Sequence, residues 1–343
     1  MMVSVLRRSG RLVRTSARLP QVSTPLSIAD YRSAGGHTFA LVHAEQTAHY
    51  TVLLNCEGSL AQWADLFGHR AISMGPDAPD VVGLSAVCES APASVDGRRQ
   101  WLLADGHHYL DPDTDIAVRA HVSVTFAAVA DDTRKEPEEM GVEVGARLPA
   151  LIGSLLGTGL AVTPMGSGDV LDVVCAAYNE ITDTDGVSWP EIGPVQSHRV
   201  RTLLCHDDFV SSSWLISPHV LDTEVLHSLI APAALVPRKR VTVTYRSTRL
   251  SPEIDPDDPS ALLHAPHLER FGGIITATEP FGRTPTIEPV TDGLPLFGRL
   301  GLRKGYDRHA ELFAAGMGIG VLLPEHSDIT DEPTRHRHRR AAD

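Results

Sequence analysis

The sequence predicts an α+β fold of mixed sheets with helices packed on them, built as two successive sheet-and-helix halves. Short runs that alternate apolar and polar residues, as half-buried strands do, are interspersed with segments whose apolar residues recur at helical spacing. The second half of the chain repeats this succession of strand and helix patterns. The length of 343 residues also indicates about two domains, since a domain has roughly 150 residues.

The first half begins with a predicted β-hairpin, because the apolar runs 38–44 and 50–55 are separated by polar residues. Leu60, Trp63 and Phe67 then recur at helical spacing after Ser59, which can cap a helix. This helix is predicted at 59–69. The elements expected after it, in order, are strands at 81–87 and 117–130, a helix from 137 to the glycines at 157 and 159, a strand at 160–163 and a helix from 169 to 177. Residues 100–109 have no clear pattern.

The second half shows the same two periodicities, separated by stretches rich in proline and aspartate. The predicted elements are strands at 199–205 and 209–216, a helix at 223–230, a strand at 240–245, a loop at 251–266, a strand at 273–278, a loop at 283–295, a strand at 300–303 and a helix at 307–315.

Both ends of the chain are basic, whereas the remainder is acidic. Residues 1–29 contain five arginines and no acidic residue, which is compatible with a disordered arm, a contact with anionic lipid or an organellar transit-type peptide. We expect a disordered tail at 326–343, which includes the run 335–340. The predicted divisions are therefore an arm at 1–29, α+β domains at 30–195 and 196–325, and the tail.

Composition excludes several function classes. The formal net charge of −13 argues against general or specific nucleic-acid binding by the body. The four cysteines are scattered, which argues against a zinc site or a disulfide framework and favours a reducing compartment. No stretch approaches the roughly 20 consecutive apolar residues that a membrane-spanning helix needs, and no secretory signal is present.

Sequence motifs for catalysis are also missing. The chain contains neither a phosphate-binding P-loop nor a His-Glu-x-x-His zinc motif. Gly157 and Gly159 lack the third glycine of a dinucleotide-binding loop. The run 111–115 begins like a calcium loop, but Ile116 replaces its turn glycine and Val122 its final glutamate. We therefore predict no catalytic, cofactor-binding or metal-binding residues and no cofactor.

Clusters of basic residues are the only candidate contact sites. We predict that they contact an anionic membrane surface or a partner protein, and they comprise Arg7, Arg8, Arg11, Arg14, Arg18, Arg238, Lys239 and Arg240. Two alternatives remain open. One is an enzyme, hydrolytic or metal-dependent, whose site is assembled from dispersed residues such as His107, His206 and Asp207. The other is a DNA-binding accessory of a mobile element that acts through its basic tails.

Several separated stretches, taken together, resemble one protein family. They occur in the same order and at similar spacing, and each is a strand or helix pattern. They are His37-Thr-Phe-Ala-Leu-Val-His-Ala44 with His49-Tyr-Thr-Val-Leu-Leu54, Glu138-Glu-Met140 with Gly145-Ala-Arg-Leu-Pro149, Val173-Val-Cys-Ala-Ala-Tyr178, Trp189-Pro-Glu-Ile-Gly-Pro194, Pro237-Arg-Lys-Arg-Val-Thr-Val-Thr-Tyr-Arg246, and Leu300-Gly-Leu-Arg-Lys-Gly-Tyr306 with Ala310–Phe313. The chain resembles actinobacterial integral membrane proteins encoded with type IV-like conjugation ATPases on mobile elements. This family is loosely grouped with the type VII secretion component EccE.

The resemblance implies a structural component of a conjugal transfer or secretion machine, not an enzyme. Its expected partners are the machine's ATPase and other membrane components, and its expected location is the cytoplasmic face of the cell membrane. Members of the family begin with two transmembrane helices, whereas this chain begins in what resembles the basic segment that follows them. We therefore expect a peripheral protein as the sequence stands, and an integral one if its start is placed too late. The family's helical segments in the second half are shortened here to the Pro-rich loops 251–269 and 283–297.

Overall fold

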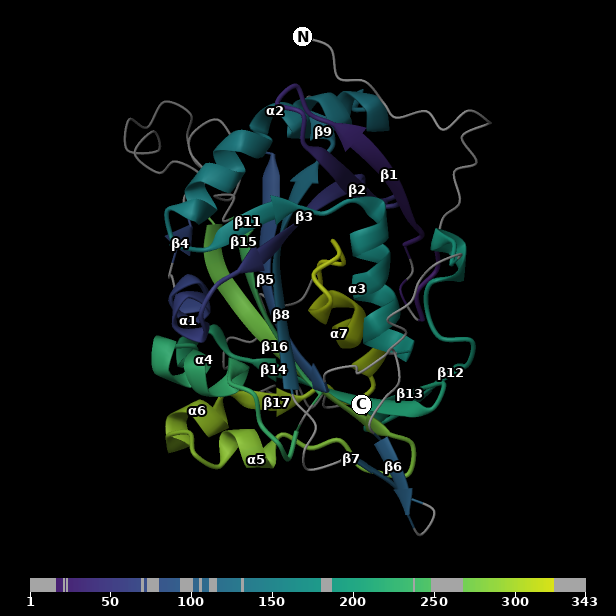
Figure 1. Cartoon of the computed structure of the whole chain (residues 1–343), viewed down its shortest axis with the longest axis vertical. Helices are drawn as coiled ribbons and strands as arrows, with labels where there is room; N and C mark the ends of the chain where they lie inside the picture. Colours follow the sequence, from purple (N-terminus) through teal and green to yellow (C-terminus); the bar gives the residue numbers. More distant parts are fainter. Residues whose placement is uncertain are drawn as a thin grey trace, which may run out of the picture.

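The computed structural model describes most of the chain between residues 17 and 323 (Figure 1). The described residues are 17–20, 22, 24–68, 71–72, 80–92, 101–104, 107–110, 116–130, 133–179, 187–236, 238–247 and 268–323.

One large sheet organises the molecule. Within the described residues it has 13 strands, and every strand pair is antiparallel. Its path is β1-β2-β3-β8-β5-β15-β16-β14-β13-β12. The bounds are β1 Leu26–Arg32, β2 Thr38–Ala44, β3 His49–Glu57, β5 Val81–Pro92, β8 Ile116–Ala127, β12 Ser197–Val200, β13 Leu203–His206, β14 Phe209–Ile216, β15 Lys239–Ser247 and β16 Leu268–Pro280. The α+β prediction is confirmed, but mixed strand directions are not found among the strand pairs of the described sheet.

Short strands complete this sheet and form two small ones. β11 (Ala161–Pro164) pairs with β3, and β17 (Leu302–Lys304) pairs with β14. β4 (Ala71–Ile72) pairs with β16. The two separate ladders are β6 with β7 and β9 with β10; their bounds are β6 Trp101–Ala104, β7 His107–Leu110, β9 Val129–Ala130 and β10 Thr133–Arg134.

The two halves of the chain repeat one topology. Each half begins with a three-stranded meander, β1-β2-β3 or β12-β13-β14, and a helix follows it. Two further strands come next, β5 and β8 or β15 and β16, and the second of these two pairs with the third strand of the meander. A short strand then pairs with that third strand in both halves: β11 on β3 and β17 on β14. The two repeats meet where β5 pairs with β15, so the strand order reads the same from either end of the sheet.

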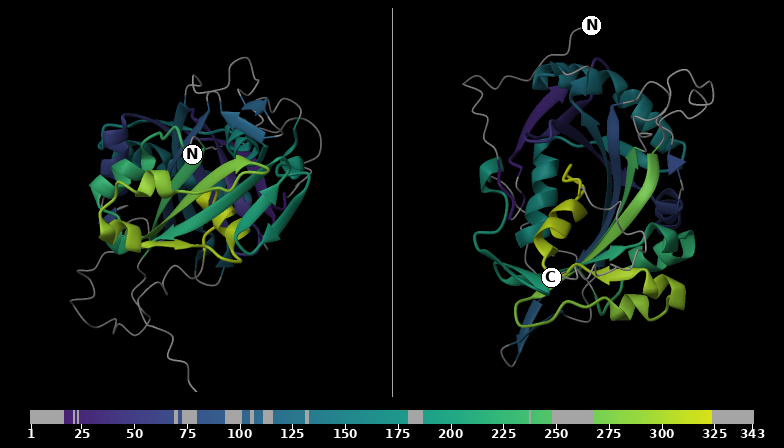
Figure 2. Two further views of the ribbon diagram at one scale, coloured as in Figure 1. Left: turned by 90° about the horizontal axis from the view of Figure 1, so that it is seen from below. Right: turned by 180° about the vertical axis from the view of Figure 1, so that it is seen from behind.

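Helices cover both faces of the sheet (Figures 1 and 2). The outer face packs against α1, Leu60–Gly68, α2, Pro137–Leu156, α4, Thr223–Ile230, and α5, Glu288–Thr291. The inner face packs against α3, Ser167–Asn179, and α7, His309–Gly316. α1 and α4 occupy equivalent places in the two repeats and contact each other. The remaining helical segments are α6, Leu296–Leu300, and the short 3-10 helices η1, Trp189–Glu191, and η2, Pro218–Val220.

The structure differs from the predicted elements at a few places. β1 begins inside the segment assigned to the basic arm, because its residues are mostly half-buried at the sheet edge and lack a clear alternation. The predicted loop 283–295 contains the short helix α5, and β16 extends well beyond the predicted strand 273–278. The predicted loop 251–266 and tail 326–343 lie outside the described residues.

A glycine-rich segment crosses the inner face after α7, and we call residues 316–323 the glycine strap. Thr242 Oγ1 donates to the carbonyl of Gly316 at 2.6 Å, and His121 Nε2 lies 3.0 Å from the carbonyl oxygen of Met317. Gly318 has φ of +67°, and a Cβ there would lie 2.6 Å from Val87 Cγ2. Glycine therefore lets the strap approach the sheet closely.

We expect Gly318→Ala to lower the free energy of unfolding by about 1–3 kcal/mol, because alanine is strained at positive φ and collides with Val87. Urea unfolding followed by tryptophan fluorescence measures this loss. Gly293→Ala is the control, since a Cβ there meets no atom within 4 Å. Equal stability of the two variants would contradict the tight packing of the strap.

Candidate functional site

The described part of the basic arm is attached to the folded body. Arg18 is exposed, but its neighbours Ala17 and Leu19 are buried, and Ala17 forms a β-bridge with Leu26. The other four arginines of the arm lie outside the described residues: Arg7, Arg8, Arg11 and Arg14.

The basic triplet at the start of β15 is buried, contrary to the prediction of an exposed contact site. Arg238, Lys239 and Arg240 are only 2%, 2% and 5% exposed. The prediction that their side chains are presented to a membrane or a partner is therefore wrong for the described structure. The run of charges suggested an exposed contact site, but all three side chains have partners within the fold, and those of Arg238 and Arg240 come from distant parts of the chain.

Two of these side chains hold the ends of helices on opposite faces of the sheet. The Arg238 guanidinium donates to the carbonyls of Ala176 and Ala177 near the C-terminus of α3. Lys239 Nζ donates to the carbonyl of Ala231, directly after α4. The last carbonyls of a helix lack intrahelical partners and carry partial negative charge, so cations stabilise them there.

Arg240 forms a buried ion pair at the junction of the repeats. Its Nε lies 3.2 Å from Glu89 Oε2 on β5, the residue directly opposite it in the β5–β15 ladder. The guanidinium also lies over the ring of Phe313 from α7, 5.1 Å from the ring centroid. Burial raises the pKa of Glu89, but the nearby Arg240 and Arg238 more than offset this effect and hold the pKa below its ordinary value. The pair therefore joins β5, β15 and α7.

The dispersed residues of the enzyme alternative have separate contacts in the structure. His206 is buried, and its Nδ1 lies 2.8 Å from the carbonyl oxygen of Tyr178. The carboxylate of Asp207 instead accepts hydrogen bonds from the backbone N–H groups of Val195 and Gln196. His107 lies on β7, in a separate two-stranded ladder, and its side chain is outside the description.

Three buried histidines are held neutral by their surroundings. Burial, aided by nearby cationic side chains, lowers the pKa of His206 to about 3 and those of His121 and His309 to about 4. His206 Nδ1 and His121 Nε2 face carbonyl oxygens, which only accept, so these nitrogens carry the protons. His309 Nδ1 accepts from the backbone N–H of Ser213. Each imidazole therefore links two segments of the fold.

Strands β3 and β8 diverge and leave a fork in the sheet. They pair as far as Asn55 and His121. Beyond that point, β3 continues beside β11 and β8 continues beside β5. A cavity of about 570 Å³ lies at the divergence, and we call it the fork pocket. It is lined by residues 55–58, 118–121 and 163–165, Leu60 and Trp63 of α1, and Asp169, Asp172 and Val173 of α3.

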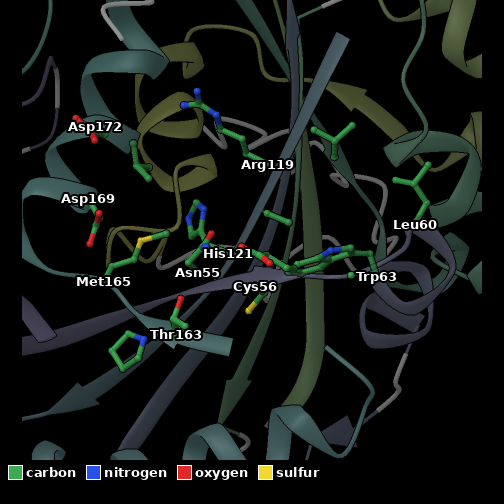
Figure 3. Close-up of a pocket in the computed structure, with 16 residues that line it drawn as sticks. Asn55, Cys56, Leu60, Trp63, Arg119, His121, Thr163, Met165, Asp169 and Asp172 are labelled. Carbon is green, nitrogen blue, oxygen red and sulfur yellow. The ribbon is translucent and has the colours of Figure 1, made fainter. Parts of the chain in front are cut away.

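The lining of the fork pocket has an acidic side and an apolar side. Figure 3 shows Asp169 and Asp172 on one side, Leu60 and Trp63 on the other, and His121 between them. Arg119 is exposed at the pocket, and Asp169 accepts from the backbone N–H of Gly166 at 2.8 Å. The pocket therefore offers hydrogen-bond acceptors beside an apolar surface.

Sequence reasoning missed the fork pocket because three stretches that are far apart in the sequence form it, 55–63, 118–121 and 163–173. Asp169 begins the helix predicted at 169–177, and Asp172 and Val173 lie on the same face of α3. Asn55, which follows the apolar run 52–54 of β3, was the one local signal.

Comparison with known proteins finds no protein-family profile and no curated protein that matches the chain. Among the described residues, none of the helices is both long and apolar enough to cross a membrane. The described side chains also contain no group of three or more His, Cys, Asp or Glu residues placed to hold a metal ion.

We expect Glu89→Gln to lower the free energy of unfolding by about 3–5 kcal/mol, because it leaves the Arg240 cation buried without its counter-charge. The double variant Glu89→Leu with Arg240→Met should recover much of this loss, since it removes both charges. Urea unfolding at neutral pH measures both. Glu311→Gln, in the more exposed pair with Arg308, is the control and should cost about 1 kcal/mol or less. A loss no larger than that of the control would contradict the structural role of the pair.

Stability should fall as the pH decreases from about 6.5 to about 4. In the unfolded chain the three histidines titrate near 6.5, whereas in the native state their pKa values are about 3 to 4. The unfolded state therefore binds more protons in this window, and the slope can reach about 4 kcal/mol per pH unit if all three contribute. Urea unfolding at a series of pH values measures the slope.

His206→Gln should reduce that slope by about one third, because one of the three histidines is removed while an amide can still donate to Tyr178. His198→Gln, an exposed position on β12, is the matched control and should leave the slope unchanged. A flat stability profile between these pH values would contradict the neutral state of the buried imidazoles.

Proposed function

We propose that the protein is a non-enzymatic structural component of a membrane-associated conjugation or secretion machine. In this proposal the folded body is the cytoplasmic domain, and it docks an ATPase partner. The observation that carries the proposal is that the buried reactive side chains hold the fold together. Arg238, Arg240, His206 and His309 each connect segments that are distant in sequence, and Lys239 joins the start of β15 to the end of the preceding helix α4.

The pKa values of the buried groups support a structural role. Burial raises the pKa values of Cys56 and Cys88 to about 12, and it raises those of Cys175 and Cys205 as well. Nucleophilic thiols need a lowered pKa, and general acids and bases work best near the operating pH. The thiols and the three buried imidazoles are shifted away from those ranges.

The basic arm supports placement at an anionic membrane surface. It contains five arginines and no acidic residue, and it joins the body at Ala17, which is anchored to β1. A basic residue near an anionic leaflet contributes about 1 kcal/mol, so several together can hold a soluble body at a membrane. The ATPase partner is inferred from the collinear resemblance to the conjugation-associated family.

Cell fractionation tests this proposal. We expect the protein to sediment with membranes and to be released by high salt, because salt screens the attraction between arginines and anionic lipid. Replacing Arg7, Arg8, Arg11 and Arg14 with glutamine should release it without salt. The matched control replaces Arg335, Arg337, Arg339 and Arg340, which removes the same charge from the other end of the chain.

Purification from the membrane fraction should then recover an ATPase with the wild-type protein. Release by detergent alone would contradict the peripheral arrangement. A protein that is wholly soluble after gentle lysis and recovers no ATPase would contradict the proposed function.

A further inference from the structure

The two repeats differ at the place where the fork pocket lies. Counted from the hairpin that joins the second and third strands of each repeat, Asn55 corresponds to Leu215. Asn55 lies between His121 on β8 and Thr163 on β11. Leu215 lies between Ile274 on β16 and Arg303 on β17 in the same arrangement. Leu215 and its neighbours in the second repeat therefore occupy the position that corresponds to the fork pocket in the first repeat.

In the second repeat this place belongs to an apolar cluster. Ile274 packs with Leu312 and Ala315 of α7 and with Leu323 of the glycine strap, and Leu215 and Val321 pack against the same cluster. In the first repeat, the equivalent pair Asn55 and His121 is polar and lines an open cavity. The fold can thus close this place with apolar side chains, and the first repeat does not.

The open strands give the pocket the shape for an extended chain. Past Asn55 and His121, β3 and β8 no longer pair with each other. The backbone edges of residues 56–57 and 118–120 that face the fork therefore have no strand beside them in the described sheet. Unpaired strand edges hydrogen-bond readily to an added extended segment, whose backbone supplies the missing partners.

The charges of the lining favour a basic segment. Three carboxylates line the pocket, those of Glu57, Asp169 and Asp172, against the single guanidinium of Arg119. His121 directs its proton-bearing nitrogen at Met317, so its other ring nitrogen is an acceptor. An arginine or lysine side chain brings several donors and a positive charge to such a site, while Leu60 and Val118 offer apolar contact to a neighbouring side chain.

We infer that the fork pocket is a docking site for an extended segment of a partner protein in which basic and apolar residues alternate. The basic side chain binds on the α3 side, at Asp169 and Asp172, and the apolar side chain packs on the α1 side. This inference names the partner chemistry at one site and rests on the proposed scaffold function. The occupant is a segment of a partner protein and not the basic tail of this chain.

Binding of a fluorescent peptide to the purified full-length protein tests the inference. The probe is a short peptide of alternating leucine and arginine, and the comparison peptide carries uncharged citrulline in place of arginine. We expect the arginine peptide to bind at least about tenfold more tightly than the citrulline peptide, which is the factor expected from loss of a partly buried charge pair.

Asp169→Asn with Asp172→Asn should weaken binding of the arginine peptide by about tenfold or more. Asparagine retains the oxygen that accepts from Gly166, so the start of α3 is preserved. The matched control is Glu224→Gln with Asp292→Asn, which removes two exposed carboxylates of the second repeat and should leave binding unchanged. Equal weakening in both pairs of variants would assign binding to general surface charge and overturn the inference.

Hydrogen exchange provides an independent readout of location. Bound peptide should slow exchange at residues 56–57 and 118–120, because their backbone groups gain partners. Protection elsewhere, without protection there, would overturn the inference.

The same peptide also tests whether the protein's own basic tail occupies the fork pocket. Replacing Arg335, Arg337, Arg339 and Arg340 with glutamine should leave peptide affinity unchanged. A large gain in affinity would show that the protein's own tail occupies the pocket, which would overturn the partner assignment. These assays contain neither membrane nor ATPase, so their failure beside successful membrane fractionation would remove the docking site and leave the proposed function in place.

Discussion

The antiparallel pairing of β5 with β15 is the interaction on which the rest of the structure depends. It joins two repeats of one topology into a single sheet, and its ladder places Glu89 opposite Arg240. The neighbouring side chains Arg238 and Lys239 extend from this strand to the ends of α3 and α4 on opposite faces. The junction therefore fixes the sheet, both helix layers and the buried charges together, and charge is tolerated there because each cation has a partner.

The central strands carry polar side chains on the inner face of the sheet, and this determines what can cover them. Thr51 bonds to Thr125 at 3.0 Å, and the equivalent residues of the second repeat, Ser211 and Thr278, are 2.7 Å apart. These hydroxyls satisfy one another across the strands, so they can be buried without losing their hydrogen bonds. α3 and α7 cover this face, and the glycine strap passes close enough to reach Thr51. At the fork pocket, part of β3 and β8 borders an open cavity instead.

Local patterns predicted local structure well and long-range contacts poorly. The helix expected at 223–230 is α4, with the same bounds, because capping by Asp222 and an apolar stripe are both written in adjacent residues. The basic triplet was misinterpreted because Glu89, the partner of Arg240, is 151 positions away. The fork pocket could not be foreseen, since it arises where two strands change partners. The α+β class followed from periodicity alone, whereas a single sheet shared by both halves required knowledge of strand pairing.

The position of the glycine strap has a consequence for biosynthesis. The strap crosses β5 and β8 of the first repeat, although it is made after almost all of the second repeat. While the chain is emerging from the ribosome, the first repeat therefore presents an uncovered row of hydroxyls and the imidazole of His121 without its carbonyl partner. The native state forms only once residues 316–323 have left the exit tunnel. Assembly of the first repeat is thus completed after translation of that segment, and a nascent chain halted before it would be a natural client for chaperones.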